Sequence, residues 1–312
     1  MNEGRYQSAS DILDDWRDSV LSGAPPTLYH VGDGELSRLE IGPGLVTLFG
    51  GAAGAGKTAL VMQLVMERLL RTPDLRALIC NVEMPPSILL DRQLDRLSGI
   101  DAEAIRHRRL GGGNAEAVGR GTEALERLAD RLAFVRPPFS LANVAESADA
   151  FGASLIVIDY IQRVGAPGEH GDRRGAVDAT MSFLRQFADA GVALFVVSAV
   201  GRSKDSKGRS SYAEGLNLAS FRESSELEFG ADDAFILATD EGEGESSGRV
   251  ILKHLKSRHG ETKDILLDFD RKRQRFTPAS RFGPTPSNVG RLKVALKEAW
   301  GHAQPASEGE EW

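Results

Sequence analysis

Residues 51–58 read Gly-Ala-Ala-Gly-Ala-Gly-Lys-Thr and lie between an apolar run, Leu45-Val-Thr-Leu-Phe49, and a helix-forming stretch that continues to Arg71. The octapeptide fits the pattern G-x-x-x-x-G-K-S/T, and the order strand, glycine loop, helix is the context that this pattern requires. Glycines let backbone N–H groups turn towards phosphate oxygens, and the start of the following helix adds its positive dipole end. The sequence therefore predicts a nucleotide-binding loop.

Two side chains of this loop have expected roles in holding ATP. Lys57 is predicted to reach the β- and γ-phosphates, and the Thr58 hydroxyl is predicted to ligate Mg²⁺. The cofactors expected from the loop are therefore ATP and Mg²⁺. The predicted nucleotide-binding residues are Gly51, Ala52, Ala53, Gly54, Ala55, Gly56, Lys57, Thr58 and Ala59.

The bulk properties exclude several classes of protein. The 312 residues allow one large α/β domain with terminal extensions, or two small domains. No run approaches the ~18 to 20 apolar residues of a membrane span, and the N-terminus is too acidic for a signal peptide, so we expect a cytoplasmic protein without a membrane partner. The single cysteine, Cys80, excludes an internal disulfide and a multi-cysteine zinc site, and its apolar neighbours predict a buried core residue.

The charge distribution leaves nucleic-acid binding open. The net charge of −7 argues against a surface covered in basic residues, but a local basic channel depends only on nearby charges. The segment 199–222 is such a locally basic stretch. A solvated loop explains it as well as a DNA contact does.

Apolar strand candidates alternate with helical stretches from Leu45 onward. The predicted strands are 45–49, 76–81, 132–135, 154–158 and 192–198, and the predicted helices are 58–71, 86–98, 115–131, 140–151 and 176–190. Near-continuously apolar strands that alternate with helices indicate a parallel sheet covered on both faces.

The pattern changes after residue 233, where strands follow one another without a helix. We predict strands at 234–239, 249–255, 263–269 and 273–276, with an acidic turn over 240–245, as an antiparallel extension at the edge of the sheet. The tail from Thr277 carries one predicted helix, 291–300, and a disordered acidic end. An amphipathic helix is predicted at 10–21, so the expected organisation is 1–24 for this helix and its connection, 25–276 for the ATPase domain, and 277–312 for the tail.

Two acidic residues follow predicted strands of the parallel sheet. Asp159 comes directly after Leu155-Ile-Val-Ile158, at the carboxyl tip where open α/β sheets place their ligands, so it is the predicted second residue on the Mg²⁺ side. Glu83 follows the second strand and precedes Pro85 and Pro86. It is a candidate for orienting the attacking water, with an ordinary cap or surface glutamate as the alternative.

Five segments together resemble the C-terminal ATPase domain of DnaB-type replicative helicases, a RecA-like P-loop family. They occur in the family's order and at close to its spacings, from about residue 25 to 276: GAAGAGKTAL, NVEMP, LIVIDYIQ, FRESSELEFGADDAFIL and KSRHG. The resemblance implies an α/β, RecA-like fold with a mostly parallel central sheet flanked by helices. It also implies a hexameric ring with ATP at the subunit interfaces and single-stranded DNA in the central channel, and replication partners such as a loader.

The resemblance also assigns roles residue by residue. Glu83 becomes the water-activating carboxylate, and Lys57, Thr58 and Asp159 keep the phosphate and Mg²⁺ roles given above. Lys256 and Arg258 match the family's basic element that reaches a neighbour's γ-phosphate, with Arg258 as an arginine finger; a solvated strand edge is the alternative for both. The family's DNA-gripping loop falls on Arg222, Glu223 and Ser225, with Arg222 as the expected phosphate contact.

Several features depart from the family pattern. Ala199 stands where the family has a glutamine that links the γ-phosphate state to the grip on DNA, and Ser225 replaces a glycine. The N-terminal collar domain is not expected within residues 1–24, so primase recruitment through it is not supported. The 10–21 helix matches the family's linker helix in position, and its Trp16 face is a predicted intersubunit contact.

Two functions remain open from the sequence. The first is a DnaB-like hexameric helicase, in a phage, plasmid or accessory form, that hydrolyses ATP and moves on single-stranded DNA. The second is a RecA-superfamily ATPase that uses ATP to switch an assembly or regulatory ring without processive unwinding. Ala199 and the acidic net charge favour the second, whereas the FRESS segment and the basic 202–209 loop favour the first.

Overall fold

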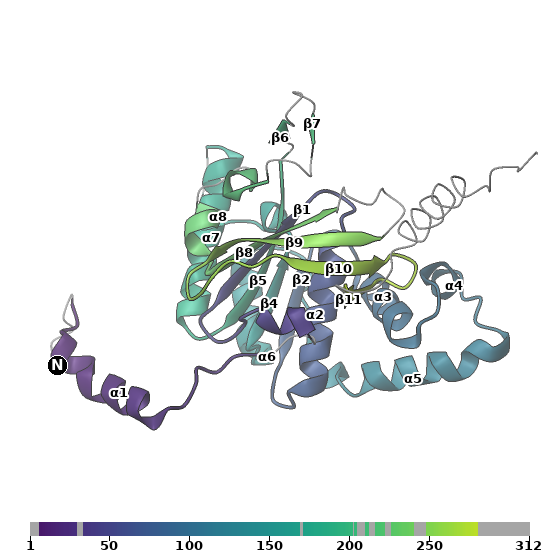
Figure 1. Ribbon diagram of the computed structural model, residues 1–312, viewed down its shortest axis with the longest axis horizontal. Coiled ribbons are helices and arrows are strands. Elements are labelled where there is room, and N and C mark those ends of the chain that lie inside the picture. The colour runs from purple at the N-terminus through teal and green to yellow at the C-terminus, as the bar shows by residue number, and fades with distance from the viewer. Residues whose placement is uncertain are drawn as a thin grey trace, which may run out of the picture.

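A nine-stranded mixed sheet forms the centre of the computed structural model (Figure 1). The structure describes residues 6–29, 34–168, 171–201, 203–204, 210–211, 216–221, 226–239 and 248–279. The strand order is β11-β10-β9-β8-β1-β5-β4-β2-β3. The strands are β1 (Val46–Gly51), β2 (Ala77–Asn81), β3 (Leu132–Phe134), β4 (Leu155–Asp159), β5 (Ala193–Ala199), β8 (Asp233–Thr239), β9 (Arg249–Ser257), β10 (Ile265–Asp270) and β11 (Arg275–Pro278).

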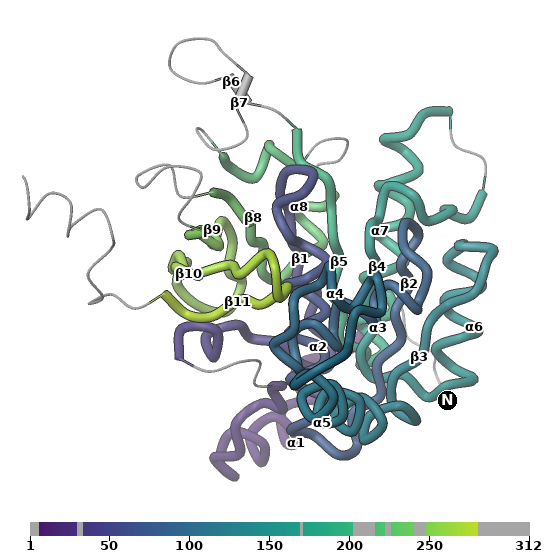
Figure 2. The backbone as a smooth tube through the Cα atoms, turned by 90° about the vertical axis from the view of Figure 1, so that its right-hand side faces the viewer, coloured from purple at the N-terminus to yellow at the C-terminus, as the bar shows by residue number. Residues whose placement is uncertain are grey.

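The strands from β8 to β3 in this order pair in parallel, and β9, β10 and β11 continue the sheet antiparallel beyond β8. Figure 2 shows this extension at one edge of the sheet and β3 at the other. Two short strands, β6 (Ser203–Lys204) and β7 (Ser210–Ser211), form a separate pair. The central strands β1, β2 and β4 are buried along their whole length, as expected for a parallel sheet with both faces covered.

Helices cover the two faces of the sheet. The described helices are α1 (Ala9–Ser22), α2 (Lys57–Arg71), α3 (Pro86–Ser98), α4 (Ala102–Arg106), α5 (Ala115–Glu126), α6 (Leu141–Phe151), α7 (Arg173–Asp189) and α8 (Glu226–Gly230). Side chains of α2 and α3 join one apolar core with Phe49, Phe195 and Phe235 of the sheet. Side chains of α6, α7 and α8 join a second core on the other face. The alternation of neighbouring strand residues between these cores explains why both faces are apolar.

The register of the parallel strands brings the functional ends together. Gly51 at the end of β1 pairs with Ala199 of β5, and Asn81 of β2 pairs with Asp159 of β4. Because all these strands run in the same direction, their carboxyl ends meet at one edge of the sheet. This edge carries the glycine loop that connects β1 to α2.

The predicted fold class and most of its elements are confirmed. The 115–131 helix is shorter than predicted, because α5 ends at Glu126 and a separate 3₁₀ turn covers Ala129–Arg131. The last strand begins at Arg275 and not at 273, because the Asp270 carboxylate accepts hydrogen bonds from the backbone N–H groups of Lys272 and Arg273 and holds a turn there. The short helices α4 and α8 were not predicted. The acidic turn 240–245 and the 291–300 helix lie outside the described residues.

The helix α1 begins close to the predicted position but contributes no buried residue. Its apolar side chains are all exposed, with Trp16 at 60% and Leu21 at 75%. Figure 1 shows α1 apart from the sheet and its covering helices. The apolar face that the sequence predicted is therefore not covered by the described part of this chain.

Membrane insertion was also tested on the described helices. None of them is long and apolar enough to cross a membrane.

Candidate active site

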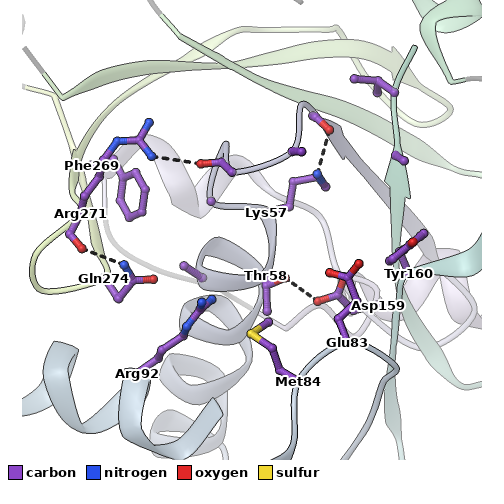
Figure 3. A pocket seen from close by; sticks show the side chains of 17 residues that line it. Lys57, Thr58, Glu83, Met84, Arg92, Asp159, Tyr160, Phe269, Arg271 and Gln274 are labelled. Atoms are coloured by element: carbon purple, nitrogen blue, oxygen red, sulfur yellow. Dashed lines mark hydrogen bonds between the residues drawn. The ribbon is translucent and has the colours of Figure 1, made fainter. Parts of the chain in front are cut away.

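The glycine loop after β1 opens onto a cavity of about 490 Å³ at the carboxyl edge of the sheet (Figure 3). Gly56, the last residue before α2, has a φ of 98°, which glycine adopts without strain. A Cβ at this position would also lie 2.9 Å from the Phe269 ring. The tight loop therefore depends on glycine twice, once for its backbone angle and once for space.

Lys57 begins α2, and its ammonium group folds back over the loop. Its Nζ donates to the carbonyl oxygens of Gly51 at 2.8 Å and Ala52 at 2.9 Å. Partial burial lowers the pKa of Lys57, whereas the nearby carboxylates of Asp159 and Glu83 act in the opposite direction. A phosphate group in the cavity would offer this cation a stronger partner than two neutral carbonyl groups.

Asp159, at the tip of β4, is held by two neighbouring elements. Its Oδ2 accepts a hydrogen bond from Thr58 Oγ1 at 2.7 Å and another from Asn81 Nδ2 at 2.8 Å. Burial raises the pKa of Asp159, and these hydrogen bonds act against that rise. The structure thus brings together the two side chains predicted to serve Mg²⁺, from segments 101 residues apart.

Glu83 lines the same cavity from the turn that follows β2. Its backbone N–H and that of Met84 both donate to Asn81 Oδ1, at 3.0 and 2.8 Å. Asn81 therefore orients Asp159 with its amide nitrogen and the Glu83 turn with its amide oxygen. Sequence reasoning missed Asn81, although its place at the end of a strand, two residues before Glu83, is the signal that could have found it.

Three further residues line the cavity that sequence reasoning also missed. Arg92 reaches it from α3, while Arg271 and Gln274 come from the turn between β10 and β11. Arg271 donates to the Gly54 carbonyl of the loop at 3.0 Å (Figure 3). These side chains offer cationic and amide groups to a ligand, but their distance from the loop along the chain hides their role in the sequence.

Lys256 and Arg258 lie at the opposite end of the sheet from the glycine loop. Ser257 pairs with Asp233, Asp233 pairs with Thr47, and Thr47 is four residues of β1 before Gly51, a span of about 13 Å. The structure therefore does not bring these two cations to the chain's own cavity. Lys256 Nζ donates to the carbonyl oxygens of Glu228 at 2.6 Å and Ala231 at 2.7 Å, at the end of α8.

The profile of the DnaB-like helicase C-terminal domain matches residues 41–278, which is most of the sequence. The chain belongs to this family. No curated protein matched the sequence.

Solved structures share the fold at low sequence identity. A DnaB-like replicative helicase, described with its interactions with primase, gives a TM-score of 0.73 at 18% identity over 89% of this chain and 68% of that chain. The ATPase domain of another DnaB-like helicase gives 0.74 at 20% identity over 88% of this chain and all of that one. A KaiC-like protein from Pyrococcus horikoshii OT3 gives 0.55 at 16% identity, over 82% of this chain and all of that one.

The DnaB-like domain has a donor set that fits Mg²⁺. The Thr58 hydroxyl and the Asp159 carboxylate are oxygen groups in direct contact at the start of α2, and Mg²⁺ prefers oxygen ligands and is usually held with substrate phosphates. Among the described residues, no group of three or more His, Cys, Asp or Glu side chains forms a metal cage. This combination suits a metal that arrives with a nucleotide.

The DnaB-like domain also compensates in part for the alanine at position 199. Ala199 and Val200 line the cavity at the end of β5. Gln162 Nε2 donates to Ser198 Oγ at 2.8 Å, and Gln162 Oε1 accepts from the Ala199 N–H at 3.3 Å. A glutamine amide is thus present at this strand end, but it comes from the turn after β4. Arg222, Glu223 and Ser225, the predicted DNA contacts, lie outside the described residues, as does most of the basic 202–209 loop.

We predict that Asn81→Ala slows ATP turnover by the DnaB-like domain about 10- to 100-fold, the usual effect of losing a side chain that orients metal-site ligands. Both Asp159 and the Glu83 turn lose a hydrogen-bond partner in this variant. Steady-state ATPase assays and circular dichroism would measure turnover and folding.

Asn143→Ala is the matched control, because Asn143 also bonds through its amide, to the carbonyl oxygens of Arg136 and Pro138 on α6's side of the fold. Turnover of Asn81→Ala equal to that of this control would contradict the orienting role.

Proposed function

We propose that this chain is an ATP-dependent motor of the DnaB-like helicase type, in which copies form a hexameric ring, hydrolyse ATP at their interfaces and grip single-stranded DNA in the central channel. The observation that carries the proposal is the cavity in which Lys57, Thr58, Glu83 and Asp159 converge. Family membership makes the domain an ATPase of the helicase class. Hydrolysis, DNA binding and ring formation are the parts that we add.

The proposed chemistry is in-line attack of water on the γ-phosphate of ATP. Glu83 is exposed at the cavity and orients the water and accepts its proton, while ADP leaves with the bridging oxygen. Lys57 moves from its carbonyl partners to the β- and γ-phosphate oxygens. Mg²⁺, held by Thr58 with Asp159 behind it, would neutralise charge on the same oxygens.

The trans role of Arg258 is supported by its distance from the chain's own cavity. Its guanidinium is 42% exposed at the far end of the sheet, where it can meet a different copy. An arginine that enters a site from a neighbour stabilises transition-state charge and contributes about 10³ to 10⁵ in rate. Lys256 is less free, since burial lowers its pKa and its ammonium caps α8, so we assign the larger effect to Arg258.

The ring itself is supported by the uncovered face of α1. Ile12, Leu13, Trp16 and Val20 are all at least 46% exposed on this helix. We propose that this face packs on the adjacent copy and closes the ring. A cytoplasmic location and replication partners such as a loader follow from the helicase reading and are part of the same proposal.

The second candidate is an ATP-switched assembly that does not unwind DNA. Ala199 favours it, because a methyl group at the cavity wall has no polar atom with which to sense the γ-phosphate. Gln162 weakens this argument, since its amide lies at the same strand end. DNA dependence of hydrolysis separates the two functions.

We predict that single-stranded DNA stimulates the ATPase rate at least about 10-fold and that Arg222→Ala abolishes the stimulation while leaving the basal rate unchanged. Arg222 is the expected phosphate contact, so its loss should also weaken DNA binding and reduce the salt dependence of that binding by about one ion. The measurement is steady-state ATPase against DNA concentration at two salt concentrations. A wild-type rate that does not respond to DNA would leave the ATP-switched assembly as the function.

We predict that Lys57→Ala and Arg258→Ala are each nearly inactive alone and that a mixture of the two regains part of the wild-type ATPase rate. In a mixed ring, some interfaces pair an intact Lys57 from one copy with an intact Arg258 from its neighbour. The assay mixes the proteins at several ratios before adding ATP. Lack of any recovery, with mixed assemblies demonstrated by mass, would show that Arg258 does not act in trans.

We predict that Trp16→Asp shifts the protein from a hexamer towards smaller species, because a charge would enter an apolar contact. Asp15→Asn is the control on the same helix, since it removes a charge from the polar side. Sedimentation velocity with ATP present measures both. Hexamers of equal stability in the two variants would exclude the α1 face from the ring contact.

A further inference from the structure

Asp232 is a buried carboxylate that joins three separate segments of the fold. Its side chain is only 3% exposed, just before β8. Oδ1 accepts from Arg258 at 2.7 Å, whereas Oδ2 accepts from Arg185 at 2.7 Å and from the backbone N–H of Val46 at 2.8 Å. Both oxygens of a buried negative charge are therefore compensated, as such a group requires.

The two arginines on this carboxylate differ in how much of their bonding capacity is used. Arg185, on α7, also donates to Asp189 at 2.9 Å and to the Gly44 carbonyl at 2.7 Å. Arg258 adds one further side-chain bond, to the Phe229 carbonyl at 3.0 Å. A guanidinium has five N–H donors, so within the described residues Arg258 keeps donors available for an anion from outside.

Backbone hydrogen bonds tie the same three segments together. The Asp232 N–H donates to the Val46 carbonyl at 2.8 Å, and the Arg258 N–H donates to the Asp232 carbonyl at 2.9 Å. Val46 begins β1, the strand that ends at the glycine loop. Asp232 is thus fixed by main chain and side chain between the strand of the chain's own phosphate loop and Arg258.

We propose that Asp232 is a positioning residue for Arg258. Its carboxylate holds one edge of the guanidinium so that the remaining donors face outward, towards the γ-phosphate bound by a neighbouring copy. This inference rests on the proposed trans role of Arg258. A long, flexible side chain that is held in this way loses less conformational freedom when it engages the transition state, which raises the rate of the chemical step without improving ATP binding.

The experiment is a double-mutant cycle on ATP turnover by the full chain, with Asp232→Asn, Arg258→Ala and the combination. We expect Arg258→Ala to lower kcat about 10³-fold. Asp232→Asn should lower kcat about 10- to 100-fold with KM within about twofold, as for a residue that orients a reacting group. Because Asp232 acts through Arg258, the double variant should be no slower than Arg258→Ala alone.

Thermal unfolding and a matched variant separate positioning from general stability. Arg185→Ala removes the other arginine from the same carboxylate, so it should lower Tm while kcat stays within about threefold of wild type. Asp232→Asn should lower Tm equally in the presence and absence of Arg258, in contrast to its effect on kcat. If Asp232→Asn does not fold, Asp232→Glu keeps the charge, moves the carboxylate by one methylene and is put through the same cycle.

Two results would overturn the positioning role while leaving the proposed function intact. One is a normal kcat for Asp232→Asn when Arg258→Ala is slow, and the other is a further loss of equal size in the double variant. An unchanged kcat for Arg258→Ala would instead contradict the trans role itself, and the inference would fall with it.

Discussion

The hydrogen bond between Thr58 Oγ1 and Asp159 Oδ2, at 2.7 Å, is the contact on which the site depends. It joins the first turn of α2 to the tip of β4, and Asn81 joins β2 to the same oxygen. A carboxylate buried at a strand end is costly unless donors meet it, and here the donors come from the loop that would hold phosphate and from the turn that carries Glu83. Loop, metal side and water side are consequently fixed by one charge.

The parallel sheet distributes function between its two ends. The carboxyl ends of its strands carry the cavity, and the antiparallel return of β9 carries Arg258 back to the other end, about 13 Å of strand away. A single copy thus offers a nucleotide cavity on one end and an exposed arginine on the other. Such a pair of unlike surfaces is what a head-to-tail ring requires, because each copy gives with one face and receives with the other. The uncovered face of α1 adds a third surface for such a contact.

Asp232 and Gln162 show how coupling groups can be supplied by unexpected positions. Asp232 connects Arg258 to the start of β1 through both its backbone and its carboxylate. Gln162 presents an amide at the end of β5, where the family resemblance would place it on residue 199. In both cases the side chain bridges two strand ends, so a displacement at one end is passed on by a hydrogen bond and not by the strand alone.

The sequence by itself determined the local features: the loop from Gly51 to Thr58, the buried strands, and the acids at their tips. These are readable because the glycine spacing and the apolar runs act over a few neighbouring residues. Only the tertiary structure brought Arg92, Arg271 and Asn81 to the cavity and showed Arg258 at the far end of the sheet. Their positions depend on strand order and register, which pair residues far apart in the chain and leave no periodic signal in the sequence.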